Sequence, residues 1–157
     1  MQSTNQIGGR GENAAQWCFL RPVHGHNGFE PTFLGEKAQL LDLRVALLNP
    51  EGKAFGPHFY VQVKTRQARR GRRFPARFTA EEVGRAKAGL VPVYVVGVEL
   101  DGDTKENVWI CGIDAQASLP SIPKAHDLRA AATLIQLYDE VQSHFNRAAY
   151  SFVTNLK

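Results

Sequence analysis

The sequence predicts a single α/β domain, and three observations carry this prediction. The chain has 157 residues, the length of one domain, and its 43% hydrophobic and 22% charged residues are ordinary for a globular protein. Segments with the two-residue periodicity of strands alternate along the chain with segments of helical periodicity. Turn-forming residues such as Asn49-Pro50-Glu51-Gly52 separate them. These features predict a mixed central sheet with helices on both faces, in the order αβββαββα.

The first half of the chain predicts one helix followed by three strands. The helix ends before Pro22, and Pro31 restricts the first strand to the edge of a sheet because proline cannot donate to the ladder. The expected elements are a helix over 10–21 and strands over 28–34, 39–48 and 58–65. Residues 1–9, with their glycines, are expected to form a flexible N-terminal segment.

The second half predicts a helix, two strands and a final helix. Thr79 and Glu82 form the sequence pattern of a capping box, and Gly89 follows the end of that helix. Strands are expected over Val91–Glu99 and Asn107–Ile113, and Asp127 is expected to cap the last helix. The domain would span residues 10–150, with a C-terminal tail over 151–157.

A dense basic segment suggests contact with a polyanion. The net charge is +4 and the sequence pI is near 9.3, and residues 64–77 (KTRQARRGRRFPAR) contain seven cations and no acid. Such a segment is also compatible with a solvated loop, but the arginine fork matches the geometry of phosphate. The expected nucleic-acid contacts are Arg66, Arg69, Arg70, Arg72, Arg73 and Arg77.

Nothing in the sequence predicts export or membrane insertion. The N-terminus lacks an apolar stretch behind a positive start, and the longest apolar run, Leu90–Leu100, is too short to span a bilayer. Cys18 and Cys111 lie in apolar segments and are expected to be small buried residues in a reducing compartment. We therefore expect a cytoplasmic protein without a membrane partner.

Polar residues interrupt two neighbouring strands where aliphatic residues would be expected. Asp42 lies in the first of these strands, and Gln62 and Lys64 share one face of the second. Burying such groups without partners would cost several kcal/mol, so they must be exposed in a cleft, paired together or bound to an ion. An Asp42–Lys64 ion pair with no further role is the structural alternative. Glu12, at the border of the first helix's buried stripe, is a further carboxylate that could overhang this face.

This order of residues resembles the PD-(D/E)XK nuclease superfamily, whose fold is the restriction-endonuclease-like core. The resemblance rests on a helical Glu, an Asp on a strand, and a Q-x-K variant of the motif on the next strand, and it spans residues 10–114. It is closest to the branches that carry Q-x-K, including Mrr-like restriction enzymes and small uncharacterised bacterial nuclease domains. Two departures are that no proline directly precedes Asp42, and that Gln62 removes a negative charge.

The resemblance implies a role for each matching residue. Asp42 would be the central ligand of Mg²⁺, for which Mn²⁺ can substitute. Gln62 would occupy the position of the usual Asp or Glu, and the Val63 carbonyl would be a further ligand. Lys64 would position or activate the attacking water, and Glu12 would act on the metal directly or through water. Carboxylate, carbonyl and water oxygens are the ligands that Mg²⁺ prefers.

The expected function is that of a metal-dependent endonuclease that hydrolyses nucleic-acid phosphodiester bonds. The resemblance implies DNA as the substrate, a role in restriction or phage defence, and either a homodimer or a larger defence-system partner. A second hypothesis belongs to a different class: a catalytically inactive module of the same fold that binds nucleic acid or a protein partner. The neutral Gln62 supports this second hypothesis.

Overall fold

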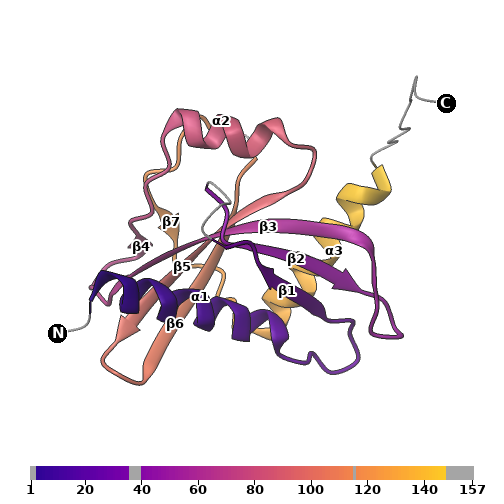
Figure 1. Ribbon diagram of the computed structural model, residues 1–157, viewed down its shortest axis with the longest axis horizontal. Helices are drawn as coiled ribbons and strands as arrows, with labels where there is room; N and C mark the ends of the chain where they lie inside the picture. The colour runs from indigo at the N-terminus through magenta and orange to yellow at the C-terminus, as the bar shows by residue number, and fades with distance from the viewer. Residues whose placement is uncertain (1–2, 36–39, 115, 148–157) are drawn as a thin grey trace.

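The computed structural model describes residues 3–35, 40–114 and 116–147, and within these ranges it contains three helices and seven strands (Figure 1). In chain order these are α1 (Thr4–Leu20), β1 (Phe29–Phe33), β2 (Leu43–Leu48), β3 (Ala54–Gln67), β4 (Arg73–Phe74), α2 (Ala80–Ala88), β5 (Val93–Asp101), β6 (Lys105–Gly112), β7 (Ile122–Pro123) and α3 (Ala131–Arg147).

Five strands form one mixed sheet in the order β1-β2-β3-β5-β6. Strands β1, β2 and β3 are antiparallel neighbours, β3 and β5 are parallel, and β6 returns antiparallel to β5. A parallel pair needs a crossover connection, and α2 lies on the segment that joins β3 to β5. The α/β class with a mixed central sheet, expected from the sequence, is confirmed.

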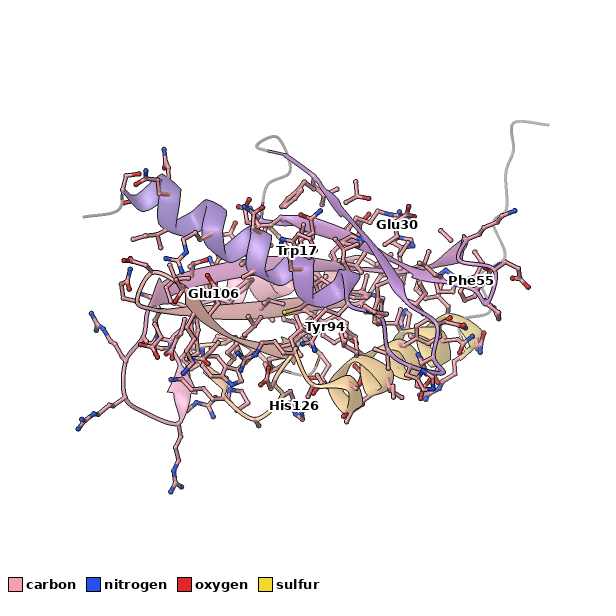
Figure 2. The ribbon with its side chains drawn as sticks, turned by 90° about the horizontal axis from the view of Figure 1, so that it is seen from below. Trp17, Glu30, Phe55, Tyr94, Glu106 and His126 are labelled. Atoms are coloured by element: carbon pink, nitrogen blue, oxygen red, sulfur yellow. The ribbon has the colours of Figure 1, made fainter. Side chains whose placement is uncertain are left out.

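The helices lie on both faces of this sheet. Strand β5 alternates between two cores: Val96 and Val98 pack with α1 and α3, while Val95 packs on the opposite face with Val83 of α2. Figure 1 shows α2 on one side of the sheet and α1 on the other, and Figure 2, seen from the side of α1, shows α1 and α3 lying across the strands. The short strands β4 and β7, which the expected order did not contain, pair with each other near α2.

Helix α1 begins earlier than the sequence suggested. Residues 4–9, expected as part of a flexible N-terminal segment, form its first turns, so that expectation was wrong for them. The reason is a capping box at Ser3: the Ser3 side chain accepts from the Gln6 N–H, and the Gln6 side chain accepts from the Ser3 N–H. This cap and the packing of the rest of the helix outweigh the low helix propensity of Gly8 and Gly9.

The other expected elements appear with shifted boundaries. The capping box of Thr79 and Glu82 is present at α2, as predicted. Asp127 does not cap α3, which starts at Ala131; its carboxylate instead accepts from the backbone N–H and guanidinium of Arg129 in the preceding turn. The tail over 151–157 lies outside the described residues. Within the described part of the chain, no helix is long and apolar enough to cross a membrane.

Helix α1 crosses β3 closely at Gly11. This glycine is buried, and a Cβ added to it would overlap the hydroxyl and the Cβ of Thr65. Phe19, two turns later, packs edge-on against Phe59 of the same strand. Helix α1 therefore runs antiparallel to β3, and its first turns lie toward the C-terminal end of that strand.

Replacing Gly11 by Ala is expected to destabilise the protein. The overlap with the Thr65 Cβ cannot be relieved by rotating a side chain, so α1 must shift, and we expect a net cost of about 1–2 kcal/mol after the gain in helix propensity. Gly84→Ala is the matched control, because a Cβ at this helical position meets nothing within 4 Å. This variant should gain up to about 1 kcal/mol. Urea denaturation measures both, and equal effects of the two substitutions would contradict the close crossing.

Candidate functional site

Asp42 lies directly before β2, where that strand separates from β3. Its Oδ2 accepts a hydrogen bond from the Val63 N–H at 2.6 Å, and its own N–H donates to the Val61 carbonyl at 2.9 Å. If β2 continued as a strand before Leu43, one of its backbone carbonyls would accept from the Val63 N–H. The Asp42 carboxylate takes the place of that carbonyl. The N–H and C=O of one strand residue point to the same side, so the Val63 carbonyl also faces the neighbourhood of Asp42.

Gln62 and Lys64 lie on the opposite face of β3 from Phe59 and Val61, toward α2. In the amide orientation that pairs both of its polar atoms, Gln62 donates to the Leu40 carbonyl at 2.8 Å and accepts from Lys64 Nζ at 3.3 Å. Lys64 Nζ also lies 5.1 Å from the centre of the Phe78 ring. Leu40 has a φ of 75°, a strained conformation for a residue other than glycine.

An open cleft of about 850 Å³ brings Glu12 of α1 beside Asp42. One wall is the first half of α1, and the opposite wall is formed by the end of β1 and the residues before β2. The lining residues are Thr4, Asn5, Gly8, Gly9, Glu12, Phe33, Gly35 and Asp42. Gly8 and Gly9 leave the middle of the helix wall without side chains, so a substrate could approach the helix backbone closely there.

The surroundings of the two carboxyl groups disfavour their charged forms. Burial raises the pKa of Glu12, and the nearby Asp42 charge raises it further. Burial also raises the pKa of Asp42, and the Val63 N–H and the Lys64 ammonium offset this rise only in part. A cation between the two carboxylates would relieve both penalties. Its binding should weaken as the pH falls toward these raised pKa values, because a protonated carboxyl group no longer attracts it.

The predicted site residues therefore fall into two neighbouring groups. Asp42 and Glu12 share the cleft, whereas Gln62 and Lys64 contact each other on the α2 side of β3. Lys64 is near enough to lower the Asp42 pKa, but Asp42 and Lys64 form no ion pair within 4 Å. The alternative expected from the sequence, an Asp42–Lys64 ion pair with no further role, is therefore not what the structure shows.

The donor set fits a hard divalent cation through the two carboxylates. Among the described residues, no group of three His, Cys, Asp or Glu side chains surrounds a common point, so further ligands would have to come from backbone or water. The Val63 carbonyl is suitably directed for this purpose. The Gln62 amide oxygen faces Lys64, so the Gln62 side chain would have to rotate before this oxygen could become a metal ligand.

Arg66, expected to contact nucleic acid, is engaged inside the protein. It forms an ion pair with Glu99, which is only 3% exposed, and its guanidinium stacks over the Phe74 ring with 4.7 Å to the ring centre. Lys124 Nζ donates to the same carboxylate at 2.8 Å. Because a buried carboxylate must be paired, Arg66 and Lys124 are held there and Arg66 is not an available cation.

The remaining arginines lie beyond the end of β3, on the segment that leads through β4 to α2. Arg73 donates to the Ser121 hydroxyl and carbonyl at 2.6 and 2.9 Å, whereas Arg69, Arg70, Arg72 and Arg77 are exposed. These four form no ion pair with any residue that the structure describes. The loop over 68–72, called here the arginine loop, turns at Gly71, whose φ of +132° favours glycine. This loop follows the C-terminal end of β3, and the first turns of α1 lie toward the same end of that strand.

Glu99 and Lys124 were not recognised in the sequence. The signal for Glu99 was a single acid in a buried apolar strand, which requires a cationic partner. Lys124 carried no local signal, since it lies far from Glu99 along the chain. It also fixes the arginine loop, because its Nζ donates to the Arg69 carbonyl at 3.2 Å and its N–H donates to the Arg72 carbonyl at 3.1 Å.

Comparisons with protein-family models, with curated proteins and with solved structures found no match to this chain.

Proposed function

We propose that this protein is a metal-dependent nuclease with a restriction-endonuclease-like core, and that it hydrolyses phosphodiester bonds of DNA. The observation that carries the proposal is the position of Asp42. Its carboxylate is fixed by the Val63 N–H, shares a cleft with Glu12, and lies within electrostatic range of Lys64 on the adjacent strand. A carboxylate pair beside a lysine is suited to phosphodiester hydrolysis.

In this proposal Asp42 and Glu12 hold the metal ion, with the Val63 carbonyl as a further ligand. The bound metal supplies charge neutralisation at the phosphate and acidifies water. Lys64 positions the attacking water, whose oxygen bonds to phosphorus while the bond from phosphorus to the leaving oxygen breaks. The proton released by the water passes to solvent, and the leaving oxygen is protonated.

Incubation of the purified protein with supercoiled plasmid tests the proposal directly. We expect nicked or linear DNA with Mg²⁺ or Mn²⁺ and intact DNA with EDTA. A Lys64→Ala variant should lose cleavage while still binding the metal, since Lys64 is not a ligand. Cleavage that persists in EDTA, or at the wild-type rate in Lys64→Ala, would contradict the assignment.

A second candidate function is a catalytically inactive module of the same fold that binds nucleic acid. The contacts of Gln62 favour it, because its amide faces Leu40 and Lys64 and adds no charge to the carboxylate pair. This module would bind DNA without cutting it under any of the metal conditions above.

Under either function, the arginine loop should contact the phosphate backbone. Changing Arg69, Arg70 and Arg72 to Ala is expected to weaken DNA binding about equally for all sequences, because phosphate contacts carry no base information. The slope of log affinity against log salt should become shallower by about 2.7, taking roughly 0.9 for each contact. Fluorescence anisotropy over a salt series measures both quantities.

The matched control for the loop removes three exposed cations elsewhere, at Lys53, Arg85 and Lys105. Net charge falls equally in the two variants. A similar loss of slope in both would mean that only overall charge matters, and would contradict a specific role for the loop.

A further inference from the structure

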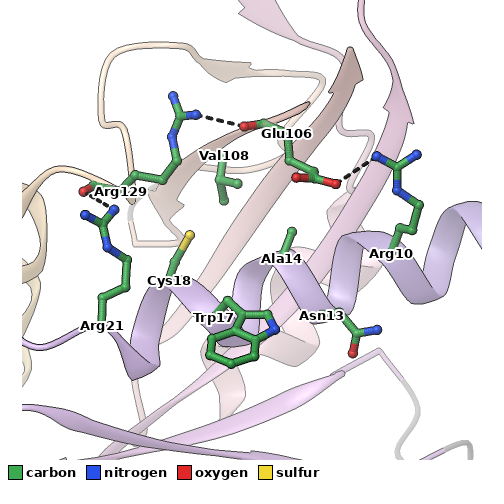
Figure 3. A pocket seen from close by; sticks show the side chains of 9 residues that line it. All are labelled: Arg10, Asn13, Ala14, Trp17, Cys18, Arg21, Glu106, Val108 and Arg129. Atoms are coloured by element: carbon green, nitrogen blue, oxygen red, sulfur yellow. Dashed lines mark hydrogen bonds and ion pairs between the residues drawn. The ribbon is translucent and has the colours of Figure 1, made fainter. Parts of the chain in front are cut away.

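A second hollow lies on the other flank of α1, between this helix and β6, with a volume of about 440 Å³ (Figure 3). We call it the Trp17 groove. Its middle is apolar, and arginines lie toward both of its ends. The lining residues are Arg10, Asn13, Ala14, Trp17, Cys18, Arg21, Glu106, Val108 and Arg129.

Trp17 is the most unusual feature of this groove. Its side chain is 69% exposed, although tryptophan has the largest apolar surface of any residue. Ala14, Cys18 and Val108 lie between the indole and the arginines in Figure 3, and they provide an apolar middle beside its ring. A flat ligand could therefore stack on the indole.

The ends of the groove are held in place by a network of hydrogen bonds. Arg10 pairs with Glu106 at 2.7 Å, and Arg129 pairs through two nitrogens with Asp127 while its Nη1 donates to the Glu106 carbonyl. Arg21 uses only Nη1, for the Arg129 carbonyl at 2.8 Å. Its Nε and Nη2 make no other hydrogen bond to residues that the structure describes, so they are available to an anion.

The backbone of β6 offers little to a peptide at this groove. The outer edge of β6 is already paired with residues 126–128, since the Ile110 N–H donates to the His126 carbonyl and the Leu128 N–H donates to the Val108 carbonyl. An extended peptide therefore cannot add to this edge of β6 as a further strand. Recognition must rely on an indole face and guanidinium groups, which are the groups that bind bases and phosphates of single strands.

We propose that the Trp17 groove binds a short stretch of single-stranded nucleic acid, with one base stacked on Trp17 and its phosphate on Arg21. Arg10, at the other end, lies about 16 Å away along the helix, so the groove has room for a few nucleotides. The inference rests on the proposed function in one respect: α1 also carries Glu12, so an unpaired strand held in the groove would belong to the substrate in the cleft.

The experiment measures binding of a fluorescein-labelled oligothymidylate in EDTA, so that the carboxylate site contributes neither metal nor cleavage. Trp17→Ala is expected to weaken binding by about 5- to 150-fold, the range for loss of one stacked base. Trp17→Phe keeps an aromatic face and should remain within about threefold of the wild type. Leu20→Ala is the matched control, since Leu20 is exposed on the same helix but does not line the groove.

Wild-type affinity in Trp17→Ala, or an equal loss in Leu20→Ala, would overturn the proposal. So would a change from dimer to monomer in Trp17→Ala by light scattering, since the face would then be an interface between two copies of the chain. Plasmid cleavage is scored separately. If binding depends on Trp17 but no metal-dependent cleavage occurs, the proposed nuclease function is wrong and the proposed binding at the Trp17 groove stands. If cleavage occurs but binding does not depend on Trp17, only the proposal for the groove is wrong.

Discussion

Replacing Asp42 by Asn is expected to abolish metal-dependent cleavage and divalent-ion binding while leaving the fold intact. Loss of an outer-shell partner of a metal typically costs 10- to 100-fold in affinity or activity, and loss of a direct ligand should cost more than about 100-fold. The Asn oxygen can still accept from the Val63 N–H, so the junction between β2 and β3 is preserved. Plasmid cleavage and isothermal titration with Mn²⁺ measure the two losses.

Thermal denaturation gives an independent readout of the same substitution. The raised pKa values of Asp42 and Glu12 mean that the folded protein favours their protonated forms over their ionised forms. The two protonated carboxyl groups therefore add to the stability of the fold at low pH, and this stabilisation is lost as the pH rises through the raised pKa values. At neutral pH, Mg²⁺ should therefore raise the melting temperature of the wild type. Asp42→Asn should melt no lower than the metal-free wild type and should not respond to Mg²⁺.

Asp101→Asn is the control for this experiment, because Asp101 is an exposed carboxylate that forms an ion pair with Lys105, away from the cleft. It should retain cleavage and the stabilisation by Mg²⁺. If Asp42→Asn cleaved DNA at the wild-type rate in Mg²⁺, the metal site would have to be placed elsewhere.

Glu99→Gln is expected to have the largest effect on stability. The substitution leaves Arg66 and Lys124 facing a neutral amide in a site where their own side chains are only 19% and 13% exposed. Breaking a buried ion pair by removing one partner costs about 3–5 kcal/mol, chiefly because an uncompensated charge remains. Urea denaturation measures this loss. Glu81→Gln, which breaks an exposed pair with Arg85 one turn away, should cost about 0.5 kcal/mol or less.

The effect of Glu99→Gln should depend on pH. Burial opposes ionisation of Glu99, but the hydrogen bonds and charges of Lys124 and Arg66 outweigh it and lower its pKa below the ordinary value of 4.5. A lowered pKa means that the contribution is complete above about pH 4.5 and is lost as the pH falls through the folded-state value. The difference in stability between wild type and variant should shrink in that acidic range. A difference that stays constant with pH would contradict a stabilising role for the Glu99 charge.

The ion pair between Glu99 and Lys124 also connects the stability of the sheet to the arginine loop. Lys124 bridges the buried carboxylate and the backbone of the arginine loop, so loss of Glu99 should loosen that loop as well. Hydrogen exchange at residues 68–72 would detect this loosening at denaturant concentrations where the sheet is still folded.

The local patterns of the sequence determined the class of the fold. Alternation of apolar residues predicted β2 and β3 because a pleated strand exposes successive side chains to opposite faces, and a short apolar run predicted β5 as a buried strand. The capping box at Thr79 predicted the start of α2 because its two hydrogen bonds are local. The candidate carboxylates and lysine were identifiable in the same way, as polar residues in strands or at the edge of an apolar helix stripe.

What depends on distant residues was decided only by the tertiary structure. Asp42 and Glu12 share a cleft because Gly11 lets α1 approach β3, and no local pattern gives that distance. Arg66 resembled its neighbours in the basic segment, but its pairing with Glu99 on the neighbouring strand β5 leaves its side chain only 19% exposed. Helical and strand periodicities are set by neighbouring residues, whereas ion pairs and clefts depend on which segments the folded chain brings together.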